Sequence, residues 1–332
     1  MTIENDSPLK RGDRINWREF LGSTTFIESR NLSRLVGCEK LYLKFEGGNP
    51  TGTQKDRIAL ALLDDAHSKG AKAVVAASFG NYGASLAWAA RIVDIPAHIY
   101  VPENYPLTKD RLKRILDAGA QLHQFPGQYE DLIERSSKDA EENGWYNANP
   151  GRPSVKTICL NAYAEIAYEI YRDIRRVPNY VFCPVGNGTT LAGIYQGFKK
   201  LYEVKKIQAI PRIVATSTRR GNPIVKSFLM NSRVIKDLAR DEVKDSKSHD
   251  PLANWHAYDG QEALDAVYES NGFADYASES KMMEFNKYLR QEEGLYVLPA
   301  AASTLAVMHD LADDKVTMKG TFVAILTGRD FE

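Results

Sequence analysis

A regular alternation of short β-branched runs and amphipathic stretches, beginning near residue 40, is the feature that most restricts the fold of this chain. The apolar runs predict strands over 41–45, 73–77, 97–101 and 121–124. The amphipathic stretches predict helices over 56–68, 84–93, 109–118 and 129–142. Strands that alternate with helices of this length form βαβ units, in which the strands are parallel. The sequence therefore predicts an α/β protein.

The alternation stops over 147–153, where Asn, Gly and two prolines cluster, and it resumes afterwards. Further strands are predicted over 180–184, 213–217 and 321–326, and further helices over 158–173, 190–202, 279–292 and from 302. The polar segment 236–260 has no clear period, so we expect it to be a surface excursion. A chain of 332 residues exceeds the usual size of one hydrophobic core, so two domains are expected.

Composition narrows the classes of partner. Lys plus Arg and Asp plus Glu both number 43, and this balance removes the usual electrostatic argument for a nucleic-acid-binding protein. The three cysteines are too few and too scattered for a disulfide framework or a zinc site. No apolar stretch approaches the length of about 18 residues that a membrane span needs, and the first residues lack the apolar core of a signal peptide. We expect a cytoplasmic enzyme with no nucleic-acid or membrane partner.

The most informative segment is NPTGTQKDR at 49–57, where a Gly- and Pro-rich loop leads into a predicted helix. Lys55 lies at the start of this helix, where the helix dipole favours the neutral amine. A neutral amine is the form that attacks carbonyl groups to make a Schiff base. Taken alone, the segment leaves open both a nucleophilic lysine and a lysine on a solvated loop.

Two more glycine-rich segments lie between a predicted strand and a predicted helix. The first, ASFGNYGA at 77–84, could hold a carboxylate through backbone N–H groups. The second, PVGNGTTLAG at 184–193, could hold a phosphate through its N–H groups and two threonine hydroxyls. It is not a dinucleotide fingerprint, because Leu191 stands at the third small position, and no Gly-Lys-Ser/Thr follows as in a P-loop.

In this order, the three segments resemble those of the fold-type-II (β-family) enzymes that use pyridoxal phosphate (PLP), and most of all the threonine synthases. EEGLYVLPA at 292–300 and Thr327-Gly328 extend the resemblance, which runs from residue 22 to residue 328. It implies a tryptophan-synthase-β-like fold with parallel-rich sheets flanked by helices. It also implies a large PLP-binding domain (1–71 and 151–332), a small mobile domain (72–150), an active site in the cleft between them, and a homodimer.

The resemblance implies a role for each cofactor-binding residue. Lys55 would carry PLP as a Schiff base and move protons, and Asn81 would bind the phenolic oxygen of the cofactor. The Thr327 hydroxyl would meet the pyridine nitrogen. A hydroxyl cannot keep that nitrogen protonated, so elimination or replacement at the β or γ carbon is favoured over transamination. The cofactor phosphate would be held by Gly186, Asn187, Gly188, Thr189 and Thr190.

The resemblance also implies a substrate site. Its carboxylate end is expected at Ser78, Gly80, Asn81 and Tyr82, and its phosphate end at Asn149 and Arg152, whose guanidinium suits bidentate phosphate binding. The expected activity is that of threonine synthase, a lyase of amino-acid biosynthesis that converts O-phosphohomoserine and water to threonine and phosphate. Three alternatives stay open: a cysteate-synthase-like replacement on O-phosphoserine, a serine/threonine dehydratase, and a catalytically silent PLP-binding regulatory subunit.

The chain departs from the resembled pattern at four positions, namely Gln54, Phe79, Tyr82 and Leu298. These departures concern the substrate more than the cofactor. No metal is expected, because the six histidines lack the spacing of a ligand set. A group of His249, Asp250, His256 and Asp259 is the nearest approach to one.

Overall fold

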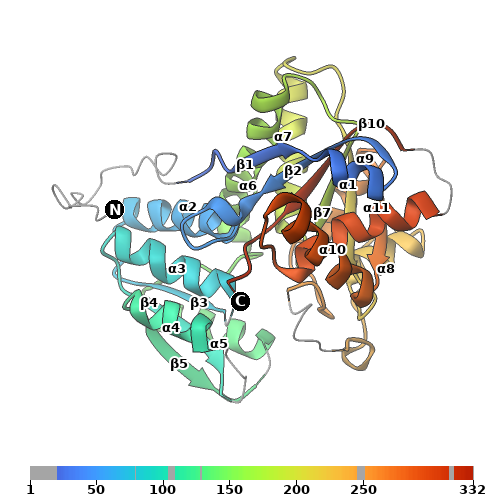
Figure 1. The fold of residues 1–332 in the computed structure, drawn as a ribbon. Helices are drawn as coiled ribbons and strands as arrows, with labels where there is room; N and C mark the ends of the chain where they lie inside the picture. The colour runs from blue at the N-terminus through green and yellow to red at the C-terminus, as the bar shows by residue number, and fades with distance from the viewer. Residues whose placement is uncertain are drawn as a thin grey trace. The chain divides into compact units, whose positions relative to one another are not determined.

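The fold is described from a computed structural model, over residues 21–78, 80–103, 109–127, 129–244, 251–313 and 318–331. The chain divides into two compact units. Unit 1 consists of Met1–Leu21 and Lys55–Asn149, and unit 2 of Gly22–Gln54 and Pro150–Glu332. Each unit has a sheet with helices packed on it, so the α/β prediction is confirmed (Figure 1). The predicted boundaries of the functional domains, at residues 71 and 151, stay a prediction.

Unit 1 is built on a four-stranded sheet of order β5-β4-β3-β6, in which all neighbouring strands are parallel. Helix α5 packs against β3, β4 and β6, while α3 packs against β3, β4 and α2. All four residues of β3 are buried, as expected for a parallel strand that is covered on both faces. The elements are α2 (Lys55–Ser68), β3 (Val74–Ala77), α3 (Asn81–Ile92), β4 (Ala97–Pro102), α4 (Lys109–Asp117), β5 (Gln121–Phe125), α5 (Tyr129–Asn143) and β6 (Tyr146–Asn147).

Unit 2 is built on a six-stranded sheet of order β1-β2-β10-β7-β8-β9, in which only β1 and β2 run antiparallel to each other. Its strands are β1 (Thr25–Glu28), β2 (Cys38–Phe45), β7 (Tyr180–Pro184), β8 (Arg212–Thr218), β9 (Phe273–Ala277) and β10 (Met318–Leu326). Its α-helices are α1 (Arg30–Leu35), α6 (Pro153–Ile174), α7 (Thr189–Glu203), α8 (Pro223–Leu229), α9 (Gly260–Glu269), α10 (Glu279–Glu293) and α11 (Ser303–Asp313). Short 3₁₀ turns are η2 (Glu46–Gly48), η3 (Arg240–Glu242) and η4 (Pro299–Ala302).

Alternate residues of the central strands in unit 2 form the core. Leu43, Phe182 and Phe322 belong to one cluster with the apolar side chains of α1, α10 and α11. The intervening residues point to the opposite face. On that face the fully buried Lys44 donates to Glu169 of α6 at 2.5 Å and to the carbonyl of Thr24 at 3.0 Å. A buried ion pair of this kind depends on both partners, because a single buried charge is costly.

The parallel strands of unit 2 end at one edge of the sheet, which is where open α/β sheets bind ligands. The segment after β7 is the glycine-rich stretch 184–190, and Thr327 directly follows β10. The turn after β8 leads to Asn222, and Ser278 follows β9. In the part of the chain that the structure describes, no helix is both long enough and apolar enough to cross a membrane.

The prediction of a surface excursion over 236–260 is wrong for its last part. Leu252 and Asp259 are buried, and the carbonyl of Pro251 packs against Gly186. The segment looked superficial because it is polar, but Asn254 and Asp259 use their polar groups in hydrogen bonds inside unit 2. Polar composition alone does not distinguish a solvated loop from a buried one whose polar groups are satisfied.

Candidate active site

The glycine-rich stretch 184–190, which we call the β7–α7 turn, packs closely against the segment 251–259. A Cβ atom on Gly186 would lie 2.0 Å from the carbonyl oxygen of Pro251. Gly188 is the N-cap of α7 with φ of +92°, and a Cβ there would lie 2.7 Å from the carbonyl oxygen of Asp259. Both positions therefore require glycine, one for space and the other also for its left-handed backbone.

Asn222 fixes the direction of this turn. Its Nδ2 donates to the carbonyls of Gly186 at 3.1 Å and of Leu252 at 3.0 Å, and its Oδ1 caps α8. Asn254 donates to the Oδ1 of Asn187 at 2.9 Å. The carbonyl of Gly186 in this turn thus accepts a hydrogen bond. The N–H groups of residues 186–188 make no hydrogen bond with any described residue. These N–H groups, with the positive end of the α7 dipole, can hold an anion such as a phosphate.

The two threonines of the turn differ in what they can offer a phosphate. The Thr189 hydroxyl donates to Oδ2 of the fully buried Asp259 at 2.5 Å, so its proton is not available to a ligand. The Thr190 hydroxyl makes no hydrogen bond with a described residue. The Lys156 ammonium bonds to Glu262 and lies 3.9 Å from Oδ1 of Asp259, so two carboxylates share it. Thr190 is therefore a side-chain donor, and Thr189 can contribute its backbone N–H.

Thr327 connects the end of β10 to the segment before Lys55. Its carbonyl accepts the N–H of Gln54 at 3.0 Å, and Gly328 forms an antiparallel bridge with Thr53. The Thr327 side chain is 8% exposed, and its hydroxyl bonds to no residue within the described ranges. It can therefore bind a ring nitrogen. The chain passes into unit 1 directly after Gln54. Lys55 is the first residue of α2, and its side chain is partly exposed.

The second glycine-rich stretch, 77–84, forms the β3–α3 turn in unit 1. The Ser78 Oγ accepts the N–H of Gly83 at 2.8 Å, and Gly80 is the N-cap of α3 with no atom within 4 Å of the place of a Cβ. The partly exposed Asn81 begins the helix, and its amide makes no hydrogen bond with the described residues. Tyr82 is buried and its hydroxyl donates to the carbonyl of Ala148, while Phe79 lies outside the described residues.

The two residues predicted for a substrate phosphate belong to different units. Asn149 is fully buried in unit 1, where its Oδ1 accepts the N–H of Ala77 at 2.8 Å. Its Nδ2 donates to Ser136 at 3.0 Å and to Asn147 at 2.8 Å, which uses both amide protons. Arg152 is the partly exposed N-cap of α6 in unit 2. The structure thus gives Asn149 a structural role, and its binding to a phosphate stays a prediction.

Taken one unit at a time, the described residues fit PLP. Unit 2 supplies unpaired N–H groups for a phosphate and a hydroxyl for a ring nitrogen, and unit 1 supplies a lysine at a helix start. A family model described as "Pyridoxal-phosphate dependent enzyme" matches residues 18–328. The chain belongs to this family. The predictions of PLP as cofactor and of a PLP-dependent lyase of fold type II are thereby confirmed.

Individual proteins agree with this assignment. Threonine synthase of Methanocaldococcus jannaschii is 28% identical over 307 residues, which are 92% of this chain and 74% of that protein. Serine racemase of Dictyostelium discoideum has a TM-score of 0.77 at 19% identity, over 95% of both chains. A threonine deaminase of Solanum lycopersicum has a TM-score of 0.78 at 16% identity, over 96% of this chain and 87% of the other. The chain is thus a PLP-dependent enzyme of the β-elimination and replacement type, and its cytoplasmic location and homodimeric state stay predictions.

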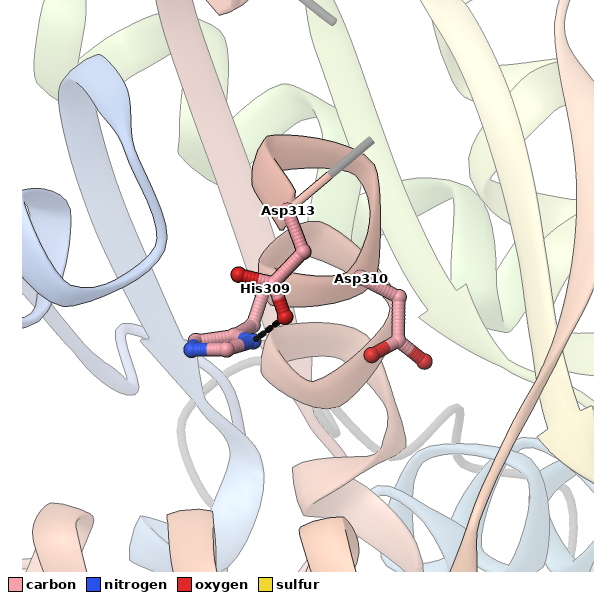
Figure 2. A group of neighbouring side chains, drawn as sticks. All are labelled: His309, Asp310 and Asp313. Atoms are coloured by element: carbon pink, nitrogen blue, oxygen red, sulfur yellow. Dashed lines mark ion pairs between the residues drawn. The ribbon is translucent and has the colours of Figure 1, made fainter. Parts of the chain in front are cut away.

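One group of potential metal ligands belongs to α11 of unit 2. Figure 2 shows His309, Asp310 and Asp313, with an ion pair between His309 and Asp313. The ammonium of Lys281 bonds to Asp310, to Asp313 at 3.2 Å and to the Nδ1 of His309 at 3.1 Å. The group therefore has a cation of its own, and we assign it no metal. Of the group considered from the sequence, His256 pairs with Asp237, and His249 and Asp250 lie outside the described residues.

Proposed function

We propose that this enzyme removes a phosphate group from a small phosphorylated amino acid, and that its reaction is that of threonine synthase. O-Phosphohomoserine and water would give threonine and inorganic phosphate. The observation that carries the proposal is the similarity to a threonine synthase over 92% of the chain. The structure supports it with an arginine at the N-terminus of the 22-residue helix α6, where helix dipole and guanidinium both favour an anion.

Each proposed residue has a task that its chemistry suits. PLP, when bound, would withdraw electrons from the α carbon of the substrate and so make its proton acidic. The Lys55 amine would take that proton and return it later in the reaction. N–H groups at the start of α3, beside Ser78 and Asn81, would hold the substrate carboxylate. Arg152 would hold the phosphate until the bond between the γ carbon and oxygen breaks, and water would supply the hydroxyl at the β carbon.

A second candidate is a serine/threonine dehydratase. The observation that favours it is the hydrogen bonding of Asn149, whose two amide protons are both used inside unit 1. Without Asn149 as a donor, Arg152 is the one remaining residue of the two proposed for a phosphate subsite. A dehydratase has no phosphate to bind and needs neither residue for that purpose.

The two candidates differ in their products, so one set of assays separates them. Purified enzyme is given O-phosphohomoserine, O-phosphoserine, serine and threonine, and both inorganic phosphate and 2-oxo acids are measured. We expect phosphate and threonine from O-phosphohomoserine. Formation of 2-oxo acids from serine or threonine without phosphate release from either ester would replace this proposal by the dehydratase.

Two variants test the residue assignments. Borohydride reduction should attach the cofactor covalently to Lys55, and Lys55→Ala should abolish this adduct. Arg152→Ala should lower kcat/KM for the phosphorylated substrate by roughly 30- to 1000-fold, because a charged bidentate partner contributes about 2–4 kcal/mol at a desolvated site. Arg176→Ala removes an exposed arginine just beyond the other end of α6 and is the matched control. Equal losses in the two arginine variants would remove Arg152 from the substrate site.

A further inference from the structure

A cavity of unit 2 lies at the same edge of the sheet as the β7–α7 turn, but at the ends of β8 and β9. Its volume is about 480 Å³, and we call it the β8–β9 cavity. Its lining comes from the end of β8 and the turn after it, from the segment before residue 245 and from the start of α10, namely Thr218, Arg219, Arg220, Glu242, Lys244, Ser278 and Glu279. It shares no lining residue with the β7–α7 turn, and none of the roles proposed above uses it.

The wall of the cavity carries an excess of positive charge. Arg220 is paired with Glu279, through contacts of 3.2 and 2.6 Å to one carboxylate oxygen, and Glu242 is paired with Lys226 at 2.5 Å. Arg219 and Lys244 are exposed and form no ion pair with a described residue. Two positive charges on one wall thus have no counter-charge among the residues placed by the structure. The N-terminus of the 15-residue helix α10, capped by Ser278, adds a positive dipole end, and Glu279, the partner of Arg220, stands in its first turn.

The segment that follows the cavity wall, Gly221 and Asn222, connects it to the β7–α7 turn. The N–H of Lys244 donates to the carbonyl of Arg220 at 2.9 Å, and the N–H of Asn254 donates to the carbonyl of Gly221 at 3.2 Å. Asn222 directly follows and donates to the carbonyl of Gly186 at 3.1 Å. One short segment of backbone and the Asn222 side chain thus link Arg219 and Arg220 to the β7–α7 turn.

We propose that the β8–β9 cavity binds a small phosphate dianion through Arg219 and Lys244, and that its occupancy alters the environment of PLP through Asn222. The ligand class follows from the two uncompensated cations and the helix terminus, which suit a compact dianion better than a single carboxylate. Free inorganic phosphate and the phosphate group of a small ester share this chemistry. Binding of the free ion would make one product of the proposed reaction a regulator of the enzyme.

The test uses holoenzyme in a phosphate-free sulfonate buffer, titrated with inorganic phosphate and separately with methyl phosphate by calorimetry. We expect saturable binding that also shifts the visible absorption of PLP. Arg219→Ala/Lys244→Ala should weaken it at least tenfold, whereas Arg176→Ala/Lys236→Ala, which removes two exposed cations elsewhere on unit 2, should not. Preference for one titrant identifies the source of the phosphate group.

The Arg152→Ala variant separates this cavity from the proposed substrate site. Binding and the spectral shift should persist in that variant even if its catalysis is lost, so the two proposals can fail independently. An absence of saturable binding in the wild type, or equal binding in the two double variants, would overturn the cavity assignment. Binding that leaves the PLP spectrum unchanged would overturn the coupling through Asn222.

Discussion

The β3–α3 turn of unit 1 and the β7–α7 turn of unit 2 look alike in sequence but are held in opposite ways. Each follows a buried parallel strand, contains glycine and begins a helix. Each is also held by a buried asparagine that is distant in sequence. Asn149 accepts the N–H of Ala77 at 2.8 Å, whereas Asn222 donates to the carbonyl of Gly186 at 3.1 Å. Asn149 therefore occupies an N–H group of the β3–α3 turn, whereas Asn222 binds a carbonyl and leaves the N–H groups of the β7–α7 turn for a ligand.

The glycines of the two turns also serve different needs. Gly80 faces open space, so its lack of a side chain provides room for a ligand. Gly186 faces the backbone of Pro251 at 2.0 Å, so its lack of a side chain lets two segments of the protein meet. A glycine-rich turn between strand and helix therefore does not by itself indicate contact with a ligand.

The largest effect is expected for alanine at Gly186, and alanine at Gly80 serves as its control. Gly186→Ala should destabilise the protein by about 3 kcal/mol, because the new methyl group meets backbone that cannot rotate away. It should also release PLP, since the turn must move. Gly80→Ala is the control and should change the free energy of unfolding by less than about 0.5 kcal/mol. Urea unfolding and PLP titration measure both effects, and similar losses in the two variants would contradict the comparison.

Replacement of either asparagine by alanine should lower the stability of the protein by a similar amount, but the two variants should differ in their affinity for PLP. Asn149→Ala and Asn222→Ala each leave buried polar groups unsatisfied and should each cost about 1–3 kcal/mol of unfolding free energy. Only Asn222→Ala should weaken PLP strongly, because it frees the β7–α7 turn. Fluorescence titration of the apo variants with PLP tests this. A greater loss of affinity in Asn149→Ala would reverse the assignment.

Thr327→Ala should have a smaller effect, of about 0.5–1.5 kcal/mol on PLP affinity, because it removes one hydrogen bond. Thr327→Asp should instead change the outcome of the reaction, since a carboxylate can keep the pyridine nitrogen protonated and promote transamination. The measured quantity is the ratio of transamination to the main reaction. An unchanged ratio in Thr327→Asp would show that unit 2 does not contact the ring through this residue.

The smallest expected effect is a pH dependence of stability that is confined to unit 1. The Nδ1 atom of His98 on β4 lies 2.9 Å from the Nε2 atom of His123 on β5. Burial lowers the pKa of both side chains, and the neighbouring His123 lowers the pKa of His98 further. The unfolded chain therefore binds protons more readily than the folded one. Stability should fall as the pH decreases from about 7 through the ordinary histidine pKa of about 6.5 towards the lower folded values.

Urea unfolding between pH 5 and pH 8 measures this slope. His98→Gln removes one of the two titrating groups and should flatten it. A slope that does not differ between the wild type and His98→Gln would contradict the role of the pair.

Much of the fold could be predicted because its signals are local. Strand β7 (Tyr180–Pro184) has the predicted bounds, and α5 and α10 end one residue later than predicted. Apolar periodicity and punctuation by glycine and proline lie within a few residues of each element, so one segment can be judged without the rest. The cofactor was predictable for another reason, because the segments around Lys55, Gly186 and Thr327 together resemble one family.

Features that depend on distant partners were not predictable. Strand β9 (Phe273–Ala277) contains Asp275 and shows no clean alternation, and it forms because β8 offers a free edge. Asn222 and Asn254 lie 36 and 67 residues from the groups that they hold in the β7–α7 turn. An asparagine in a polar segment carries no local sign of such a bond. The same is true of Asp259, whose carboxylate accepts the Thr189 hydroxyl.

The position of β10 has a consequence for how the chain is made. This strand lies between β2 and β7 in the sheet of unit 2. Its partners in β2 come 281 positions earlier in the chain, as in the pair of Phe45 and Leu326. On the ribosome, the two halves of that sheet cannot join until residue 326 has emerged. Unit 1 has its four strands within 74–147 and can form much earlier. Loss of a few residues from β10 should therefore leave unit 1 folded and unit 2 open to aggregation.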